Sequence, residues 1–119
     1  MLDHITVAVK DFERSRAFYD NALAPLGITR LYADGDHAAG YGHAGKAFFW
    51  IAQQNRLATQ AHIAFAAPDH DSIVAFHEAA LANGGRDNGA PGPRPQYHHR
   101  YFAAFVLDPD GNNVEAVLQ

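Results

Sequence analysis

The chain has 119 residues, of which 48% are hydrophobic, and it carries a formal net charge of −4 when its eight histidines are neutral. This length and apolar content predict a single globular domain and argue against disorder. The basic residues are scattered, which argues against a nucleic-acid surface, and the absence of cysteine excludes disulfides, thiolate metal sites and cysteine nucleophiles.

The N-terminal sequence MLDHITVAVKD lacks the basic start and the continuous apolar core of a signal peptide. No apolar run approaches the roughly 20 residues that span a bilayer. With the lack of cysteine, these features predict a cytoplasmic protein that binds neither membrane nor nucleic acid.

The first half of the chain predicts a strand, a helix and three further strands. Apolar residues alternate along 3–9, as in a strand, and Asp11 is then placed to cap a helix N-terminus. Pro25 is expected to end that helix. Strand-like segments follow at 28–32, 37–41 (weakly marked) and 47–52.

The second half repeats this order after a predicted linker at 53–60. Residues 62–67 are expected to form a strand, and Asp69 is expected to cap a helix that ends at 83–85. Residues 101–107 and 113–118 predict strands on either side of the turn sequence DPDGN. The strand expected before them is poorly marked, because residues 86–100 read as a loop rich in glycine and proline.

An internal repeat explains the similar halves. Segments 4–23 and 62–81 align without a gap at an offset of 58 residues, and eight of their 20 positions are identical. The matches include His4 with His62, Asp11 with Asp69, and Phe18 with Phe76. A repeat of this length predicts two equivalent βαβββ modules, at about 1–52 and 61–119.

The repeat also suggests a metal site. His4 and His62 open the first strand of each module, so a pseudo-two-fold arrangement would direct both into one cleft. Glu115 is a charged residue inside an otherwise apolar strand, where a carboxylate is costly to bury without a partner or a metal. Two imidazoles and one carboxylate suit Fe(II), Mn(II), Ni(II) or Zn(II) with coordination positions left open for chemistry.

Alignment of the two last strands places Trp50 opposite Glu115. The symmetry-related set is therefore His4, Trp50, His62 and Glu115, in which the indole cannot act as a ligand. The alternative to a metal site is that both histidines form hydrogen bonds where the modules meet, with Glu115 as a partner and Trp50 filling the space.

The sequence resembles the vicinal oxygen chelate superfamily of glyoxalase I, bleomycin-resistance proteins and extradiol dioxygenases. The resemblance covers essentially the whole chain and rests on DHITVAVKDFERSRAFYDNAL, AHIAFAAPD and above all FVLDPDGNNVEAV. It implies an α+β fold of two βαβββ modules that form a cupped, eight-stranded mixed sheet with a helix outside each module. It also implies a homodimer.

Carried over by residue, the resemblance places the metal ligands of the first, fifth and eighth strands on His4, His62 and Glu115. Glyoxalase I has a further glutamate on the fourth strand, which acts as ligand and in proton transfer. Trp50 stands at that position and argues against lactoylglutathione lyase activity. The remaining triad resembles that of extradiol dioxygenases, whose histidine and tyrosine acid-base groups could correspond to His98, His99, Tyr97 and Tyr101. Glu115 is also a catalytic candidate.

The loop 86–100 is expected near the mouth of the cleft. Its side chains combine rings, possible general acids and a guanidinium that could hold an aromatic or carboxylated substrate. The candidate substrate-binding residues are Trp50, Tyr97, Arg100 and Tyr101.

Three functions remain open from the sequence. The first is a metal-dependent dioxygenase, lyase or isomerase that acts on a small molecule with vicinal oxygens. The second is a metal-free binding protein of the bleomycin-resistance kind, favoured by Trp50 and the aromatic cleft. The third is an accessory domain without a site.

Overall fold

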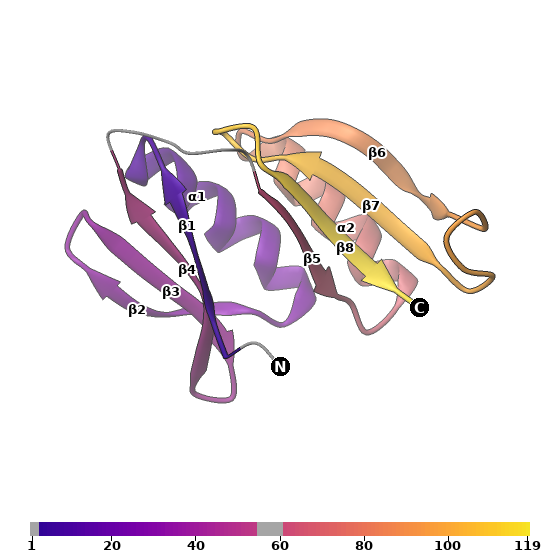
Figure 1. The fold of residues 1–119 in the computed structure, drawn as a ribbon, viewed down its shortest axis with the longest axis horizontal. Helices are drawn as coiled ribbons and strands as arrows, with labels where there is room; N and C mark the ends of the chain where they lie inside the picture. The colour runs from indigo at the N-terminus through magenta and orange to yellow at the C-terminus, as the bar shows by residue number, and fades with distance from the viewer. Residues whose placement is uncertain (1–2, 55–60) are drawn as a thin grey trace.

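The computed structural model describes residues 3–54 and 61–119 (Figure 1). The first half contains β1 (Ile5–Val9), α1 (Phe12–Leu23), the short 3-10 helix η1 (Ala24–Leu26), β2 (Thr29–Asp34), β3 (Ala38–His43) and β4 (Lys46–Gln53). The second half contains β5 (His62–Ala66), α2 (His70–Ala82), β6 (Arg86–Pro93), β7 (Phe102–Leu107) and β8 (Asn113–Leu118).

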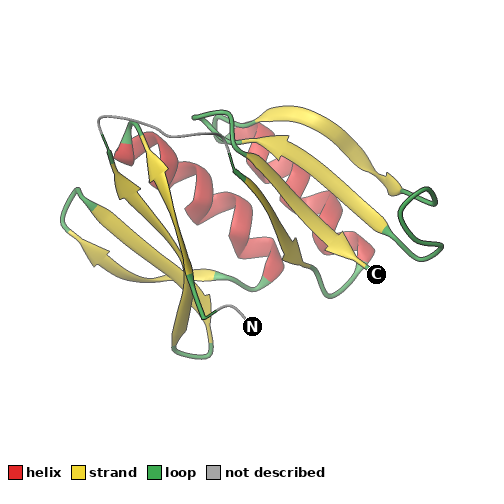
Figure 2. Cartoon of the chain, viewed as in Figure 1, coloured by secondary structure: helices red, strands yellow, loops and turns green. Residues whose placement is uncertain are grey.

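The strands form two four-stranded sheets of the same topology. Their orders are β1-β4-β3-β2 and β5-β8-β7-β6, and in each sheet the first and last strands of the module pair in parallel. This confirms the predicted α+β fold of two βαβββ modules. The eight strands divide between two hydrogen-bonded sheets rather than forming one, and both helices lie behind the strands in the view of Figure 2.

The helices begin and end where the sequence predicts. The Asp11 carboxylate accepts a hydrogen bond from the backbone N–H of Arg14 at 3.2 Å, and Asp69 does the same for Ser72 at 2.8 Å. Each carboxylate thereby satisfies a backbone donor that a helix start leaves free. The first helix ends at Leu23, next to the proline-containing turn η1, and the second ends at Ala82.

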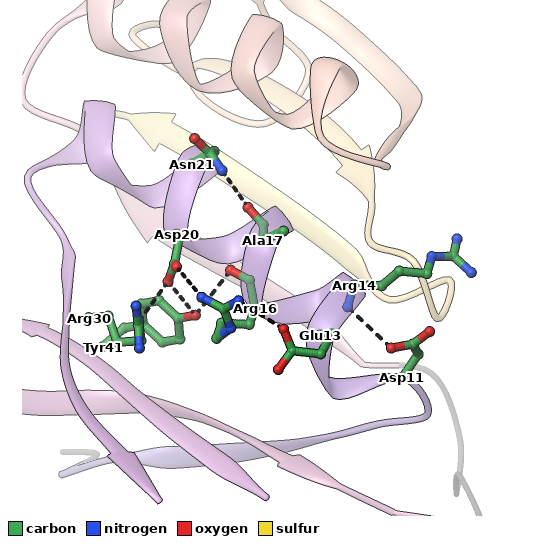
Figure 3. Close-up of polar contacts among 9 residues, drawn as sticks. All are labelled: Asp11, Glu13, Arg14, Arg16, Ala17, Asp20, Asn21, Arg30 and Tyr41. Carbon is green, nitrogen blue, oxygen red and sulfur yellow. Dashed lines mark hydrogen bonds and ion pairs between the residues drawn. The ribbon is translucent and has the colours of Figure 1, made fainter. Parts of the chain in front are cut away.

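One carboxylate ties α1 to its own sheet. Oδ1 of Asp20 accepts hydrogen bonds from the Tyr41 hydroxyl at 2.9 Å and from Nε of Arg30 at 3.1 Å (Figure 3). Burial, and next the charge of Asp20, raises the pKa of Tyr41. Helix α1 is therefore held over β2 and β3 by polar contacts as well as by its buried apolar face.

The hydrophobic core extends across both modules. The rings of Phe49 in β4 and Phe65 in β5 meet edge to face, with centroids 5.1 Å apart, and helices α1 and α2 contact each other. Aromatic pairs in this geometry add to the stabilisation from burial alone. Neither described helix has the length and apolar character needed to cross a membrane.

The prediction of a loop throughout 86–100 was wrong for its first part, because β6 occupies Arg86–Pro93. This strand pairs with β7 at the edge of its sheet, with register shifts between Asp87 and Gly89 and between Gly89 and Gly92. An edge strand tolerates proline and glycine, which hide it in the sequence. The predicted linker starts inside β4, which ends at Gln53, and its residues 55–60 lie outside the described part of the chain.

Candidate functional site

A polar pair on the second sheet joins His62 and Glu115. Successive side chains of a strand point to opposite faces, so Val114 and Ala116 enter the core while Glu115 points away from it. Glu115 is nevertheless only 2% exposed, and its Oε1 lies 2.9 Å from Nε2 of His62. A buried carboxylate therefore lies in contact with a half-exposed imidazole. This arrangement is typical of two metal ligands or of an acid-base pair.

Tyr101 contacts the second oxygen of the Glu115 carboxylate. Its hydroxyl donates a hydrogen bond to Oε2 of Glu115. Burial, and next this hydrogen bond, raises the pKa of Tyr101 to about 12, so the phenol keeps its proton at neutral pH. The structure therefore brings three of the predicted site residues together as a chain of contacts: His62, Glu115 and Tyr101.

Two further residues complete this face, and the sequence analysis missed both. Phe105 of β7 pairs in register with Glu115, and the guanidinium carbon of Arg94 lies 5.4 Å from the centroid of its ring. Arg94 is held there by hydrogen bonds from its guanidinium to the carbonyls of Gly92 and Ala90, each 2.8 Å long. The alternation of residues in 101–107 is the signal that could have placed Phe105 beside Glu115. The position of Arg94 has no such signal, because it depends on the backbone path of the turn between β6 and β7.

His4 lies across a crevice from His62. Both residues line a cavity of about 500 Å3 whose walls come mostly from β1, β4 and β5. Nδ1 of His4 is 2.9 Å from Oδ1 of Asp3, and the same oxygen accepts a hydrogen bond from Nζ of Lys46 at 2.8 Å. The hydrogen bond from Lys46, and next that from His4, lowers the pKa of Asp3.

The three predicted ligands are therefore not equally placed. His62 and Glu115 touch, whereas His4 bonds to Asp3. Within residues 3–54 and 61–119, no group of three or more His, Cys, Asp and Glu residues is arranged to hold a metal ion. The alternative of hydrogen-bonded histidines remains open, since His62 contacts Glu115 and His4 contacts Asp3, each within its own module.

The strand register supports the equivalence of Trp50 and Glu115. Thr6 of β1 pairs with Trp50 of β4, and Ala64 of β5, which follows Thr6 by the repeat offset, pairs with Glu115 of β8. The two residues thus occupy the same place in their sheets. In the first module this place carries an apolar ring, and in the second it carries a carboxylate.

Trp50 belongs to an aromatic platform, which we define as Trp50 and Tyr32 lying over Gly40. Gly40 pairs with Tyr32 of β2 on one side and with Trp50 on the other. The two rings are close to parallel, with 15° between their planes and centroids 5.9 Å apart. Sequence analysis missed Tyr32, because only the register of three strands shows that it reaches Trp50.

The remaining candidates lie in the turn between β6 and β7. Tyr97 contacts Tyr101 edge to face at 5.2 Å between centroids, so it lies next to the site. His98 accepts a hydrogen bond from the backbone N–H of Arg100. His99 and Arg100 line a different cavity, formed with the start of α2 and the end of β8. No hydrogen bond among the described residues joins His98 or His99 to Glu115.

Comparison with known proteins is consistent with this fold. A family model described as the Glyoxalase/Bleomycin resistance protein/Dioxygenase superfamily matches residues 1–116. Among curated proteins, no significant match to the chain exists.

Solved structures resemble the chain over its whole length. A glyoxalase/bleomycin resistance protein from Albidiferax ferrireducens has 33% sequence identity and a TM-score of 0.88, with 100% of this chain and 99% of that chain covered. A glyoxalase-related enzyme from Fulvimarina pelagi has 18% identity and a TM-score of 0.75, with coverages of 100% and 88%.

A third neighbour is a mutant of the fosfomycin resistance protein FosX from Listeria monocytogenes. It has 24% identity and a TM-score of 0.71, with coverages of 98% and 87%. That protein was solved in complex with Mn(II) and 1S,2S-dihydroxypropylphosphonic acid.

Proposed function

Because the chain belongs to the Glyoxalase/Bleomycin resistance protein/Dioxygenase superfamily, we propose that it is a metal-dependent enzyme. Its substrate is a small molecule with neighbouring oxygen atoms, and its reaction is that of a dioxygenase, lyase or isomerase. The observation that carries this proposal is the contact of 2.9 Å between His62 and the buried Glu115. We also propose that the whole chain is one domain and that it acts in the cytoplasm.

The residues of this pair fit a divalent transition metal. One imidazole nitrogen and one carboxylate oxygen are a donor set that Fe(II), Mn(II), Ni(II) and Zn(II) accept. Glu115 is 2% exposed, and a carboxylate so placed needs a cation or hydrogen bonds to offset its lost hydration. A bound metal would polarise a substrate oxygen and stabilise a developing enolate or catecholate.

The neighbouring residues have defined roles in this proposal. Tyr101 keeps its proton and holds the orientation of Glu115 through Oε2. The Arg94 guanidinium, fixed over Phe105, presents positive charge at the edge of the same face. Trp50 supplies no ligand, which disfavours lactoylglutathione lyase activity. His98 and His99 remain candidates for proton transfer, and Tyr97 and Arg100 for substrate binding.

We propose that His4 of a second copy completes the ligand set in a homodimer. Within one chain His4 lies just before β1 of the other sheet and contacts Asp3, whereas His62 and Glu115 already contact each other. A two-fold dimer in which the open faces of unlike modules meet would form two equal sites, each with His4 from one copy and His62 and Glu115 from its partner.

Mixing two defective variants tests the metal and the dimer together. His4→Ala and His62→Ala are each expected to bind no Mn(II), the metal found in the FosX neighbour. After the two are unfolded and refolded together, a heterodimer has one site with both changes and one site with neither. About one quarter of all sites should then regain metal, as measured by elemental analysis after gel filtration.

Two results would contradict this proposal. Wild-type protein without any transition metal, and without a gain in thermal stability from Fe(II), Mn(II), Ni(II) or Zn(II), would exclude the metal site. Metal binding by wild type but no recovery in the mixture would exclude the shared arrangement.

A metal-free binding protein of the bleomycin-resistance kind is the second candidate. The observation that favours it is the aromatic platform, in which the exposed Tyr32 stacks on Trp50. Under this alternative, ligand affinity would be unchanged in His62→Ala, because His62 does not line the cavity at the platform, and in the presence of a chelator.

A further inference from the structure

We infer that the aromatic platform is a ligand-binding surface that takes an uncharged, planar aromatic ring. This inference deepens the proposed function and rests on it for the idea of a small-molecule substrate. The ring is the part of the ligand that lies on Trp50 and Tyr32.

The platform is built into the sheet. Tyr32, Gly40 and Trp50 stand side by side on β2, β3 and β4, and Thr6 of β1 extends the same cross-strand row. A Cβ atom added at Gly40 would lie 2.8 Å from the Trp50 ring. The missing side chain at this position therefore lets the indole lie flat across the middle strand, where it meets Tyr32 (Figure 1 shows the three strands).

The platform is open to a ligand. Tyr32 is 55% exposed, although an aromatic ring of this size is usually more deeply buried. Tyr32 and Trp50 line a cavity of about 540 Å3, which falls within the usual range for small-molecule sites. Their centroids are 5.9 Å apart, too close to admit a ring between them, so the ligand would stack on the outer surface.

The charges around the cavity balance. Asp3, His4 and Lys46 also line it, and the Asp3 carboxylate contacts the Lys46 ammonium and the His4 imidazole through one oxygen. The negative charge of the Asp3 carboxylate is offset by the positive charge of the Lys46 ammonium, which lies 2.8 Å away. This favours an uncharged ring over an aromatic anion or cation. Lys46 and His4 supply polar groups to the same cavity.

The equivalent row in the second module has a different chemistry. There Glu115 replaces Trp50, Phe105 replaces Gly40 and Gly89 replaces Tyr32. The two copies of the repeat thus share a backbone arrangement but differ in the chemistry of their side chains. One module presents polar ligands and the other presents a flat apolar surface.

The sole tryptophan makes this inference directly testable. Metal-free, 15N-labelled protein gives one indole N–H signal in a 1H–15N spectrum, and 2-naphthylmethanol is titrated at pH 8. We expect a saturable shift of the indole signal. Decahydro-2-naphthylmethanol has the same hydroxymethyl group on a saturated, non-planar frame, and we expect it to cause little or no shift. The anion 2-naphthoate should bind no more tightly than the alcohol.

Variants locate the binding. Tyr32→Leu keeps apolar bulk at an exposed position but removes the ring, and it should weaken binding by at least about threefold. Gly40→Ala keeps both rings but displaces the indole, and it should also weaken binding. Leu81→Ala removes an exposed apolar side chain from α2 and should leave the affinity unchanged.

An absent indole shift, an equal shift with the saturated alcohol, or unchanged affinity in Tyr32→Leu would each overturn the inference. Because the titration needs no metal, its result is separate from that of the mixing experiment. Metal binding without an indole shift would reject the platform alone, and an indole shift without metal binding would reject the metal site alone.

Discussion

The hydroxyl of Tyr19 in α1 donates a hydrogen bond of 2.8 Å to Oδ2 of Asp108, which precedes the turn between β7 and β8. Both residues are buried, and they belong to different modules. Asp108 also accepts hydrogen bonds from the backbone N–H groups of Asp110 and Asn112 and from the Asn112 side chain. Oδ1 of Asn112 in turn accepts from the backbone N–H of Ala61, the residue before His62. The first helix is thereby linked to the strand that carries the candidate metal ligand.

Tyr19→Phe should lower the free energy of unfolding by about 1–2 kcal/mol, because it removes one buried hydrogen bond to a carboxylate that keeps its other donors. Chemical denaturation monitored by circular dichroism measures the change. Tyr41→Phe is the matched control, since its partner Asp20 is partly exposed and also contacts Arg16 and Arg30. A larger loss in Tyr41→Phe would show that the link between modules is the weaker of the two contacts.

Stability should fall in alkaline solution because of the buried tyrosines. Burial, and next the charge of Asp108, raises the pKa of Tyr19 well above its usual value of 10.0. The folded protein therefore holds this proton more tightly than the unfolded chain. The stabilisation is complete below pH 10 and is lost as the pH rises above it. Urea unfolding between pH 8 and 11.5 should show the decline, and Tyr19→Phe should make it shallower. An equal loss of stability with rising pH in both proteins would contradict the assignment of this effect to Tyr19.

His62→Gln should abolish stabilisation by Mn(II). At a metal concentration a hundredfold above the dissociation constant, the wild-type protein should gain about 2.7 kcal/mol. His77→Gln is a close control, because Nε2 of His77 lies 2.9 Å from Oδ1 of Asp87, the same separation as in the His62–Glu115 pair. Thermal unfolding with and without Mn(II) is the measurement. Equal loss of stabilisation in both variants would show binding that is not specific to the site.

Gly40→Ala should move the indole of Trp50 away from β3, since the new Cβ would lie 2.8 Å from the ring. We expect tryptophan emission to shift to longer wavelength and stability to fall by about 1 kcal/mol, the low end for overpacking, because the ring can turn toward solvent. Gly92→Ala serves as control, because its nearest neighbour is Nη1 of Arg94 at 3.4 Å. An unchanged emission spectrum in Gly40→Ala would contradict the description of the platform.

The sequence alone predicted the features that depend on nearby residues or on the repeat. The caps at Asp11 and Asp69 act over three residues, and the turn after Asp108 is encoded by its own proline and glycine. The repeat placed Trp50 and Glu115 at equivalent positions of two matching modules, and the register agrees with that placement.

Contacts between distant strands could not be found in this way, because they depend on register and on which edge each strand occupies. Strand β6 forms despite its prolines, since pairing with β7 needs only one of its edges. Tyr32 reaches Trp50 because Gly40 has no side chain, so the indole can lie over it, and Tyr101 reaches Glu115 because the preceding turn brings it back. His4 was predicted as a ligand from the repeat, but the tertiary structure places it beside Asp3 and Lys46. The sequence thus determined two copies of one module with Trp50 and Glu115 at equivalent positions. Only the tertiary packing decided which side chains surround each of them, because those contacts depend on strand register and on the backbone path of the turns.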